Sequence, residues 1–349
     1  MGSLNDSLME TAINVAKDGS LPWESFRGKT IVVTGATGLV CSQLVRVFLA
    51  RNNFFSLGSK LILPVRNIEK AKAMFNGYSG IKLIKWELGL PLEGIDEADY
   101  FVHGACGTSS KAFQQNPAST IGQIVSGGES TLNVAAELGV EKYVFLSTME
   151  VYGEVEGVAS EDNLGKLDPM VVRNSYPEAK RLVECLCASA YSECGVPAVV
   201  LRLAQTFGQG VPQNDGRVFA EFGRQALKGE NIVLLSDGLK KNPYLSVNDA
   251  SRAIITSLAQ GKPGEAYNAA NEDSYCSIKE MAEMVLEQFG ASDTKVVREF
   301  DAAREATFRK SSDLKLDTTK IKSLGWVPQD SLLDMYSAMI RVWGYEADE

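Results

Sequence analysis

The chain has 349 residues, of which 45% are hydrophobic and 23% charged, as in an ordinary water-soluble globular protein with a large core. Its net charge of −9 argues against nucleic acid as a partner. No apolar run approaches the ~18–20 residues of a membrane span, and residues 1–28 lack the pattern of a signal peptide. We therefore expect a cytoplasmic protein with no membrane segment.

The cysteines and the histidine do not predict a metal site. The six cysteines form no CxxC pair, and His103 is the only histidine. Zinc sites in proteins are built from clustered cysteine and histidine ligands at characteristic spacings, which this chain lacks. His103 follows a predicted strand, at a plausible edge of a ligand cleft, but we expect it to be structural.

Strands and helices are predicted to alternate along the first part of the chain. The apolar face of residues 4–15 has helical spacing, so residues 1–28 are expected to form a helical extension. Apolar runs then predict strands at 31–33, 60–65, 81–86, 98–102, 142–146 and 197–203, and helical patterns occupy 44–49, 69–75, 117–138 and 176–191. Because each strand–helix unit takes about thirty residues, we predict a parallel sheet with helices on both faces.

The second half of the chain is less regular. Strands predicted at 231–235 and 266–270, with helices at 219–228 and 277–289, would build a small lobe that closes over the first part. The polar, glycine-rich stretch 208–216 is expected at the mouth of a site, because loops at the carboxyl edge of a parallel sheet carry ligand contacts.

A glycine-rich turn follows the first strand, in the segment TGATGLV at residues 34–40. Small residues at such a turn let a dinucleotide pyrophosphate approach the backbone and the N-terminus of the next helix. We therefore expect a nicotinamide dinucleotide to bind at Gly35, Thr37, Gly38, Leu39 and Val40.

The residues after the second and third strands bear on the choice of cofactor. Arg66 stands where an acidic residue would bind both hydroxyls of the adenosine ribose, and an arginine there favours the 2′-phosphate of NADP. A solvent-facing Arg66 is the alternative. Glu87 lies where a carboxylate would meet the adenine amine, with Leu88 beside it.

Tyr176 and Lys180 form a YxxxK pair, which on a helix places a phenol and an ammonium on one face. A nearby ammonium favours the phenolate, so Tyr176 would act as the base that takes the hydroxyl proton of a bound alcohol. Lys180 would also bind the cofactor ribose. Thr148, or Ser147 beside it, would hold the same substrate oxygen at the end of a strand.

Taken in order, these segments resemble the extended short-chain dehydrogenases/reductases, specifically the NAD-dependent epimerase/dehydratase group that acts on nucleotide sugars. The resemblance covers roughly residues 29–343. It rests on TGATGLV, on LSTMEVYG at 146–153, on YPEAK at 176–180, on DGRV at 215–218 and on GWVP at 325–328.

The resemblance implies an α/β fold with a Rossmann-type doubly wound parallel sheet and a smaller C-terminal substrate-binding lobe. Residues 29–204 are expected to form mainly the NAD(P)-binding Rossmann domain. Residues 205–349 are expected to form mainly the substrate-binding lobe, with some segments returning to the Rossmann sheet.

Within the group, the chain looks most similar to the UDP-glucuronate decarboxylases, which share the segments around Glu150 and Arg217. It departs from their pattern at four positions, where larger or less polar residues stand. Cys41 stands where the pattern has the third glycine of the dinucleotide-binding turn. Ile124 and Gln205 stand where the pattern has asparagines, and Asn242 stands where it has an arginine. Gln205 and Arg217 are expected to contact the substrate.

The implied chemistry is transient oxidation at C4 of the sugar, with the cofactor reoxidised in the same turnover. The resulting 4-keto sugar is labile at C5, so decarboxylation, 4-epimerisation and 4,6-dehydration all remain open. A non-catalytic NAD(P)-binding sensor or scaffold is the alternative from another class, favoured by the four departures.

Glu150 distinguishes these reactions. Relatives that dehydrate carry an aspartic acid before the glutamate, and here that position is Met149, which donates no proton. Epimerases usually lack the glutamate. Glu150 beside an inert neighbour therefore matches the decarboxylase pattern. The cation that would meet a substrate carboxylate is not identified among Arg202, Arg217, Lys240 and Lys241.

Three further expectations follow from the resemblance. The cofactor is NAD or NADP, since relatives that work by transient oxidation often use NAD whereas Arg66 favours NADP. The substrate is a nucleotide sugar. The chain is expected to form a homodimer through helices within 121–138 and 176–191, an isologous contact in relatives.

Overall fold

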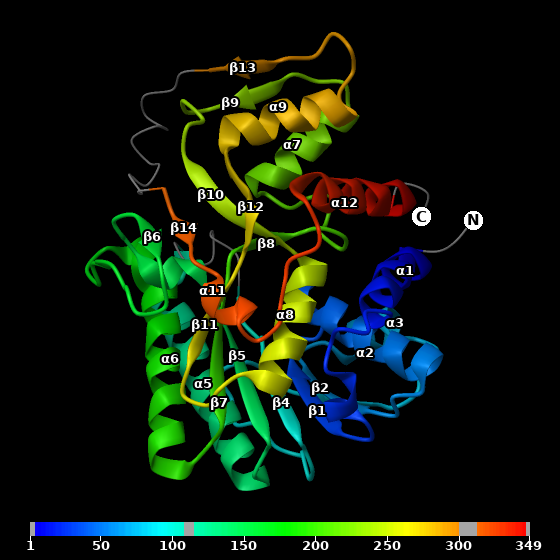
Figure 1. Ribbon diagram of the computed structural model, residues 1–349, viewed down its shortest axis with the longest axis vertical. Helices are drawn as coiled ribbons and strands as arrows, with labels where there is room; N and C mark the ends of the chain where they lie inside the picture. The colour runs from blue at the N-terminus through cyan, green and yellow to red at the C-terminus, as the bar shows by residue number, and fades with distance from the viewer. Residues whose placement is uncertain (1–3, 108–114, 300–312, 347–349) are drawn as a thin grey trace.

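A parallel sheet of seven strands forms the centre of the computed structural model, which describes residues 4–107, 115–299 and 313–346 (Figure 1). Its strands are β1 (Thr30–Thr34), β2 (Lys60–Val65), β3 (Ile81–Lys85), β4 (Tyr100–His103), β5 (Lys142–Thr148), β7 (Ala198–Leu203) and β11 (Ala266–Ala269). Their order is β11-β7-β5-β4-β1-β2-β3, so the winding direction reverses between β1 and β4. This is the predicted doubly wound α/β fold.

Helices cover both faces of the sheet because successive strand residues point to opposite sides. Ile31 and Val33 pack with one group of helices and Val32 packs with the other. The first group is α1 (Leu4–Ala16), α2 (Leu39–Phe55), α3 (Ile68–Met74), α8 (Val247–Gln260) and α11 (Thr319–Lys322). The second is α5 (Pro117–Leu138) and α6 (Ser175–Cys194).

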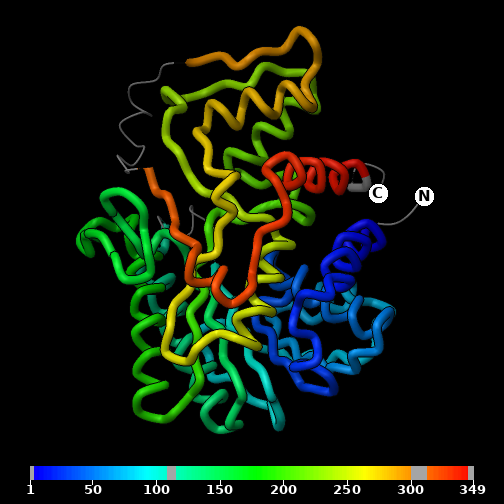
Figure 2. Tube along the Cα trace, viewed as in Figure 1, coloured from blue at the N-terminus to red at the C-terminus, as the bar shows by residue number. Residues whose placement is uncertain are grey.

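A smaller lobe lies beyond the carboxyl ends of the central strands, and Figure 2 traces how the second half of the chain builds it. Its own core packs around Phe207, Phe219, Tyr244 and Tyr336. The lobe contains β8 (Gln205–Phe207), α7 (Val218–Leu227), β9 (Ile232–Leu234), β10 (Lys241–Ser246), β12 (Asn271–Ser277), α9 (Ile278–Phe289), β13 (Val296–Arg298) and α12 (Leu332–Glu346). β11 and α8 leave the lobe and join the central sheet layer.

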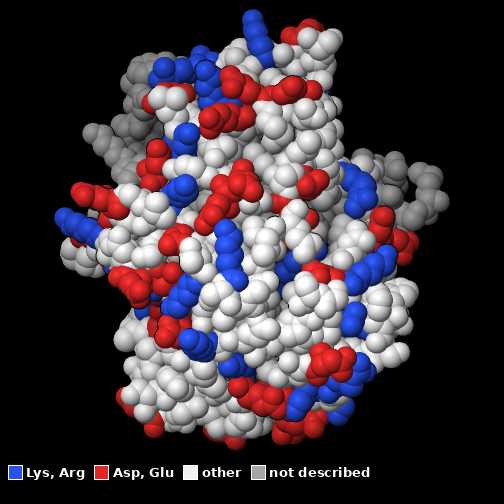
Figure 3. Space-filling model, viewed as in Figure 1, with Lys and Arg blue, Asp and Glu red and all other residues white. Residues whose placement is uncertain are grey.

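Several short elements complete the structure. These are the 3-10 helices η1 (Trp23–Phe26), η2 (Met149–Tyr152) and η3 (Val172–Asn174), and the strands β6 (Val158–Ala159) and β14 (Lys315–Leu316), which pair in parallel. In the described ranges, no helix is both long and apolar enough to cross a bilayer. Acidic and basic side chains are interspersed over the face of the molecule seen in Figure 3.

Helix α8 is an element that the sequence analysis did not predict. Asp249 and Arg252 are buried in it and form an ion pair at 3.0 Å. The Asp249 carboxylate also accepts the backbone N–H groups of Gln329 and Asp330, at 3.0 Å each. These buried polar residues interrupt the apolar periodicity by which a helix is recognised.

The departure at Cys41 is accommodated by a glycine that directly follows the neighbouring strand β4. The Cys41 sulfur lies against Gly104, where an added Cβ would come within 2.3 Å of it. The start of α2 and the end of β4 therefore approach closely even though the third fingerprint glycine is replaced. A residue larger than glycine at position 41 could splay the turn, but Gly104 provides the space for its side chain from the opposite side.

This packing predicts a coupled pair of substitutions. Gly104→Ala should lower the free energy of unfolding by about 1–3 kcal/mol, because a new methyl group would overlap the Cys41 sulfur. Adding Cys41→Ala should recover much of that loss, as measured by urea unfolding. Gly107→Ala is the control, since nothing lies within 4 Å of its added Cβ. Equal destabilisation with and without Cys41→Ala would show that the two residues are not coupled.

Candidate active site

A cleft of about 830 Å³ lies at the carboxyl ends of β1, β2 and β5. This is the edge at which doubly wound sheets bind ligands. Every residue that the sequence analysis assigned to cofactor, catalysis or substrate lines it. They are Gly35, Thr37, Gly38, Leu39, Val40, Arg66, Glu87, Leu88, Ser147, Thr148, Glu150, Tyr176, Lys180, Gln205 and Arg217.

The glycine turn has the geometry that a dinucleotide requires. Gly35 has φ of 73°, and an added Cβ there would lie 2.7 Å from the carbonyl carbon of Gly104. Gly38 is the N-cap of α2 and carries no side chain to cap the first N–H groups of the helix. The cleft passes over Leu39 and Val40, so their backbone faces the space where a pyrophosphate would bind. The residues of this turn therefore fit the pyrophosphate of a nicotinamide dinucleotide.

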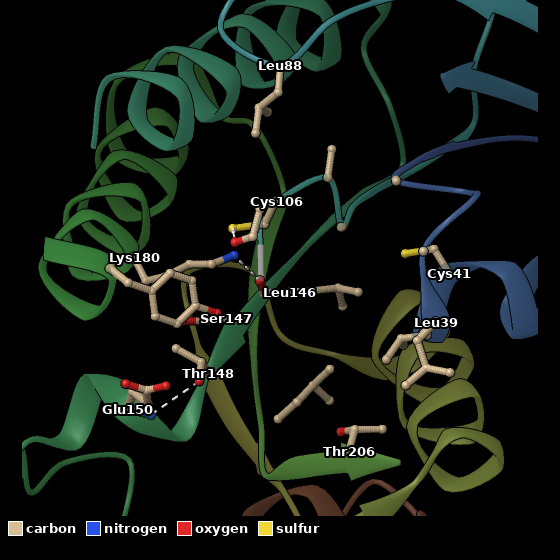
Figure 4. A pocket seen from close by; sticks show the side chains of 18 of the residues that line it. Leu39, Cys41, Leu88, Cys106, Leu146, Ser147, Thr148, Glu150, Lys180 and Thr206 are labelled. Carbon is tan, nitrogen blue, oxygen red and sulfur yellow. Dashed lines mark hydrogen bonds between the residues drawn. The ribbon is translucent and has the colours of Figure 1, made fainter. Parts of the chain in front are cut away.

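Three side chains from β5 and α6 meet on the opposite side of the cleft. Lys180 is buried, and its ammonium donates a hydrogen bond of 2.8 Å to the carbonyl of Leu146. Thr148 lies at the end of β5 and hydrogen bonds with Tyr176. In Figure 4, Lys180, Thr148 and Glu150 lie across the cleft from Leu39 and Cys41 of α2.

The electrostatic environment of Tyr176 is dominated by its burial. Burial raises the pKa of its phenol well above 10, and the groups that lower this pKa are the Thr148 hydroxyl and the Arg173 guanidinium. We expected the Lys180 ammonium to favour the phenolate. The Lys180 Nζ lies 6.0 Å from the centroid of the Tyr176 ring, and it also contacts the Leu146 carbonyl and the ring of Phe145, whose centroid lies 4.5 Å away.

Ser147 and Thr148 have different partners, which distinguishes the two candidates for the substrate oxygen. The Ser147 hydroxyl donates to the carboxylate of Glu184, and Glu184 forms a buried ion pair with Arg202 at 2.8 Å. Arg202 also donates to the phenol oxygen of Tyr152 at 2.9 Å. Ser147 and Arg202 therefore belong to one structural network, which leaves Thr148 as the hydroxyl beside Tyr176.

An ion pair between Glu150 and Arg173 forms part of the cleft wall. Arg173 Nη2 lies 2.9 Å from a Glu150 carboxylate oxygen. Glu150 lies in η2, directly after β5, and Arg173 lies in η3, directly before α6. The sequence analysis missed Arg173, although its position three residues before Tyr176 was a signal that could have placed it near the site.

Two of the other cations that the sequence analysis considered for a substrate carboxylate have acidic partners. Arg217 pairs with Asp215 at 2.6 Å, and Lys241 approaches Glu280 at 3.9 Å. Lys240 and Asn242 both line the cleft. Of the four cations that the sequence analysis considered as partners of a substrate carboxylate, Arg202 is already paired with Glu184 in the network described above.

The departure at Ile124 has a packing explanation. Ile124 is buried in the apolar core between α5, α6 and the sheet, where the related proteins carry an asparagine. Apolar contacts thus surround the side chain at this position. Gln205, at the start of β8, lines the cleft where we expected a substrate contact.

His103 and Cys106 lie close to the site. His103 is buried, hydrogen bonds with Thr34 at 2.9 Å, and has a pKa lowered to about 3 by burial, as expected for a structural histidine. Cys106 lines the cleft beside Lys180, and burial raises the pKa of its thiol. No cluster of three metal-ligating side chains occurs in the described ranges.

The sequence model of the NAD dependent epimerase/dehydratase family matches residues 31–270. The chain belongs to this family. The match includes the glycine turn, the strand end with Thr148 and the Tyr176–Lys180 pair, which together face the cleft.

Named relatives and solved structures agree with this membership. UDP-glucuronic acid decarboxylase 2 of Arabidopsis thaliana is 29% identical over 90% of this chain and 68% of its own length. An epimerase from Methanothermobacter thermautotrophicus has a TM-score of 0.77 at 21% identity, covering 93% of this chain and 95% of its own. UDP-glucuronic acid 4-epimerase from Bacillus cereus, with UDP-glucuronic acid and NAD bound, has a TM-score of 0.74 at 20% identity, covering 92% and 100%. At these identities the two structures show the shared fold.

The contrast between Thr148 and Ser147 yields a prediction about pH. Thr148→Val removes a hydrogen bond that lowers the pKa of Tyr176, so the phenolate should form only at higher pH. The acid limb of the kcat/KM profile, for the substrate proposed below, should move up by about one pH unit. Ser147→Ala should lower stability, because Glu184 loses a donor, but leave the acid limb in place. A shift of equal size in both variants would refute this assignment.

Proposed function

We propose that this protein is a nicotinamide-dependent UDP-sugar enzyme that converts UDP-glucuronate to a UDP-pentose and carbon dioxide. The observation that carries the proposal is the Glu150–Arg173 ion pair on the cleft wall, with Met149 as the neighbour of Glu150. The relatives named UDP-glucuronic acid decarboxylase support the same assignment.

Tyr176 and Thr148 would act together at C4 of the sugar. The Tyr176 phenolate takes the proton of the C4 hydroxyl, and the Thr148 hydroxyl holds the same oxygen. A nicotinamide bound in the cleft would supply the reversible hydride acceptor that oxidation at C4 requires. Lys180 fixes α6 against β5 through Leu146, so that Tyr176 stays within reach of the substrate.

The 4-keto sugar makes decarboxylation possible, because its carboxylate is then attached to the carbon next to a ketone. The C5–carboxyl bond breaks, carbon dioxide leaves, and the electron pair is held by the C4 oxygen near Tyr176. A proton from solvent water must then be added at C5, and Glu150 would relay this proton or orient the water that supplies it. Arg173 compensates the charge of Glu150, so the substrate carboxylate does not face an unpaired anion.

Particular residues distinguish the proposed decarboxylation from the alternative functions. Dehydration at C6 needs an acid at Met149, where none is available. A UDP-sugar 4-epimerase does not need the Glu150–Arg173 pair, yet uses the same Tyr176 chemistry, so it remains the nearest alternative. A sensor or scaffold would not require Thr148, Tyr176 and Lys180 to face one cleft.

We further infer that the protein acts as a cytoplasmic homodimer. α5 and α6 pack against each other, and they carry the exposed apolar side chains Ile121, Leu182 and Tyr191. All six cysteines are free thiols, as is usual in a reducing compartment.

The substrate is tested by incubating purified protein, supplied with NAD or NADP, with UDP-glucuronate, UDP-glucose and dTDP-glucose. Mass spectrometry should show a UDP-pentose from UDP-glucuronate alone. Glu150→Gln should lose about 100-fold in kcat while still binding cofactor, because the group that handles the C5 proton is removed. Glu156→Gln, an exposed neighbour, is the control. If the product is instead a UDP-hexuronate epimer with its carboxylate intact, the protein is an epimerase and the decarboxylase proposal is wrong.

The dimer is tested by light scattering at micromolar protein concentration. The wild-type protein should have twice the mass of the chain, and Leu182→Glu should give a monomer, because a charge would be buried at the interface between the helices. Leu227→Glu, on the exposed side of α7, should remain dimeric. A monomeric wild-type protein would contradict the inference.

A further inference from the structure

Two consecutive residues of α6 hold the backbone on either side of the segment 147–150. Lys180 donates to the carbonyl of Leu146 at 2.8 Å, and Figure 4 shows this bond as a dashed line. Arg181 donates from its Nε to the carbonyl of Val151 at 2.7 Å. The residues between these two carbonyls carry the hydroxyl and the carboxylate of the proposed reaction. The helix that carries the phenol therefore holds this segment at both of its ends.

Arg181 also joins the two limbs of the loop that follows η2. Its Nη2 donates to the carbonyl of Gly165 at 2.9 Å. Gly165 lies alongside the end of η2, where its N–H donates to the carbonyl of Tyr152 at 3.0 Å, and Glu154 pairs with Lys166 next to it. Because the donors of a guanidinium form a rigid planar fork, one arginine can hold two carbonyls at once. A lysine at this position would lack that fork.

The carboxylate and the backbone of Glu150 are held by different arginines. Arg173 pairs with the carboxylate at 2.9 Å. The Thr148 hydroxyl accepts the N–H of Glu150 at 3.2 Å, where η2 begins. Arg181 holds the carbonyl of Val151, the residue after Glu150. The last carbonyls of a short helix have no partner inside it, so a donor from another element fixes the place where the helix ends.

Arg181 lies behind the cleft wall. Its side chain is half-buried and does not line the cleft, whereas Glu150 does. In the part of the chain that the structure describes, Arg181 forms no ion pair, and its hydrogen bonds go to the two backbone carbonyls. A change at Arg181 therefore reaches the cleft through the backbone that carries Glu150.

We propose that Arg181 is a positioning residue for Glu150, which holds this carboxylate where it serves the addition of a proton at C5. The inference rests on the role that the proposed function gives to Glu150. In that step a proton from solvent water is added at C5 after carbon dioxide has left. A displaced carboxylate slows this step without weakening the binding of the substrate or the cofactor.

Arg181→Lys tests the proposal in two backgrounds of the full chain, with UDP-glucuronate as substrate and the cofactor supplied. With Glu150 present, kcat should fall by about 10- to 100-fold while KM changes by less than about twofold. In the Glu150→Gln variant, the same substitution should lower kcat by less than about twofold, because the carboxylate that Arg181 positions is already absent.

A control variant and a second readout separate positioning from general loss of structure. Arg51→Lys is the matched control, because Arg51 is also half-buried, donates to the carbonyl of Ala16 at 2.8 Å and does not line the cleft. Its kcat should equal that of the wild type. Hydrogen exchange read by mass spectrometry should be faster in residues 151–166 of Arg181→Lys and unchanged in the glycine turn at 34–40.

The outcomes separate this proposal from the function on which it rests. An equal fall of kcat in both backgrounds would overturn the positioning role and leave the decarboxylase proposal standing. An unchanged kcat in Arg181→Lys with Glu150 present would also overturn it. If the wild-type protein forms no UDP-pentose, both proposals are wrong.

Discussion

The hydrogen bond from Lys180 to the carbonyl of Leu146 joins α6 to the end of β5, and the geometry of the active site depends on it. Because Lys180 is buried, breaking this bond would remove the carbonyl acceptor of an ammonium that has little access to water. The bond places Tyr176, one turn earlier on α6, beside Thr148 on β5. The residues that flank these two elements, Arg173 before α6 and Glu150 after β5, are thereby brought together as an ion pair. Lys180 of the YxxxK pair thus has a structural role, which is to hold Tyr176 in position for its chemical role.

Charge in the cleft is divided between two ends. At the substrate end, a carboxylate and a guanidinium compensate each other next to a buried phenol, which suits an anionic sugar whose own carboxylate is lost during the reaction. At the cofactor end, Arg66, Lys70 and Glu87 all line the cleft, and none of them forms an ion pair within the described ranges.

Much of the fold and most of the cleft could be predicted from the sequence, because both depend on local patterns. The turn after β1 and the pair Tyr176–Lys180 are short motifs whose spacing dictates their geometry. The elements and contacts that were not predicted depend on residues far apart in the sequence. α8 was not predicted because it contains the buried polar residues Asp249 and Arg252. β10 was not predicted because it contains a proline and a register shift between Asn242 and Tyr244. Arg173 and the link from Ser147 to Glu184 join segments that only the fold brings together, so no local pattern reveals them.

The most direct measurement of the central claim follows the hydrogens of UDP-glucuronate in deuterated water. Transient oxidation at C4 with loss of the C5 carboxylate predicts a UDP-pentose that carries one deuterium at C5 and protium at C4, because the hydride returns to the carbon it left. Absorbance of reduced nicotinamide should not accumulate beyond the amount of protein. A product that keeps its carboxylate, or reduced cofactor formed in step with product, would contradict the account.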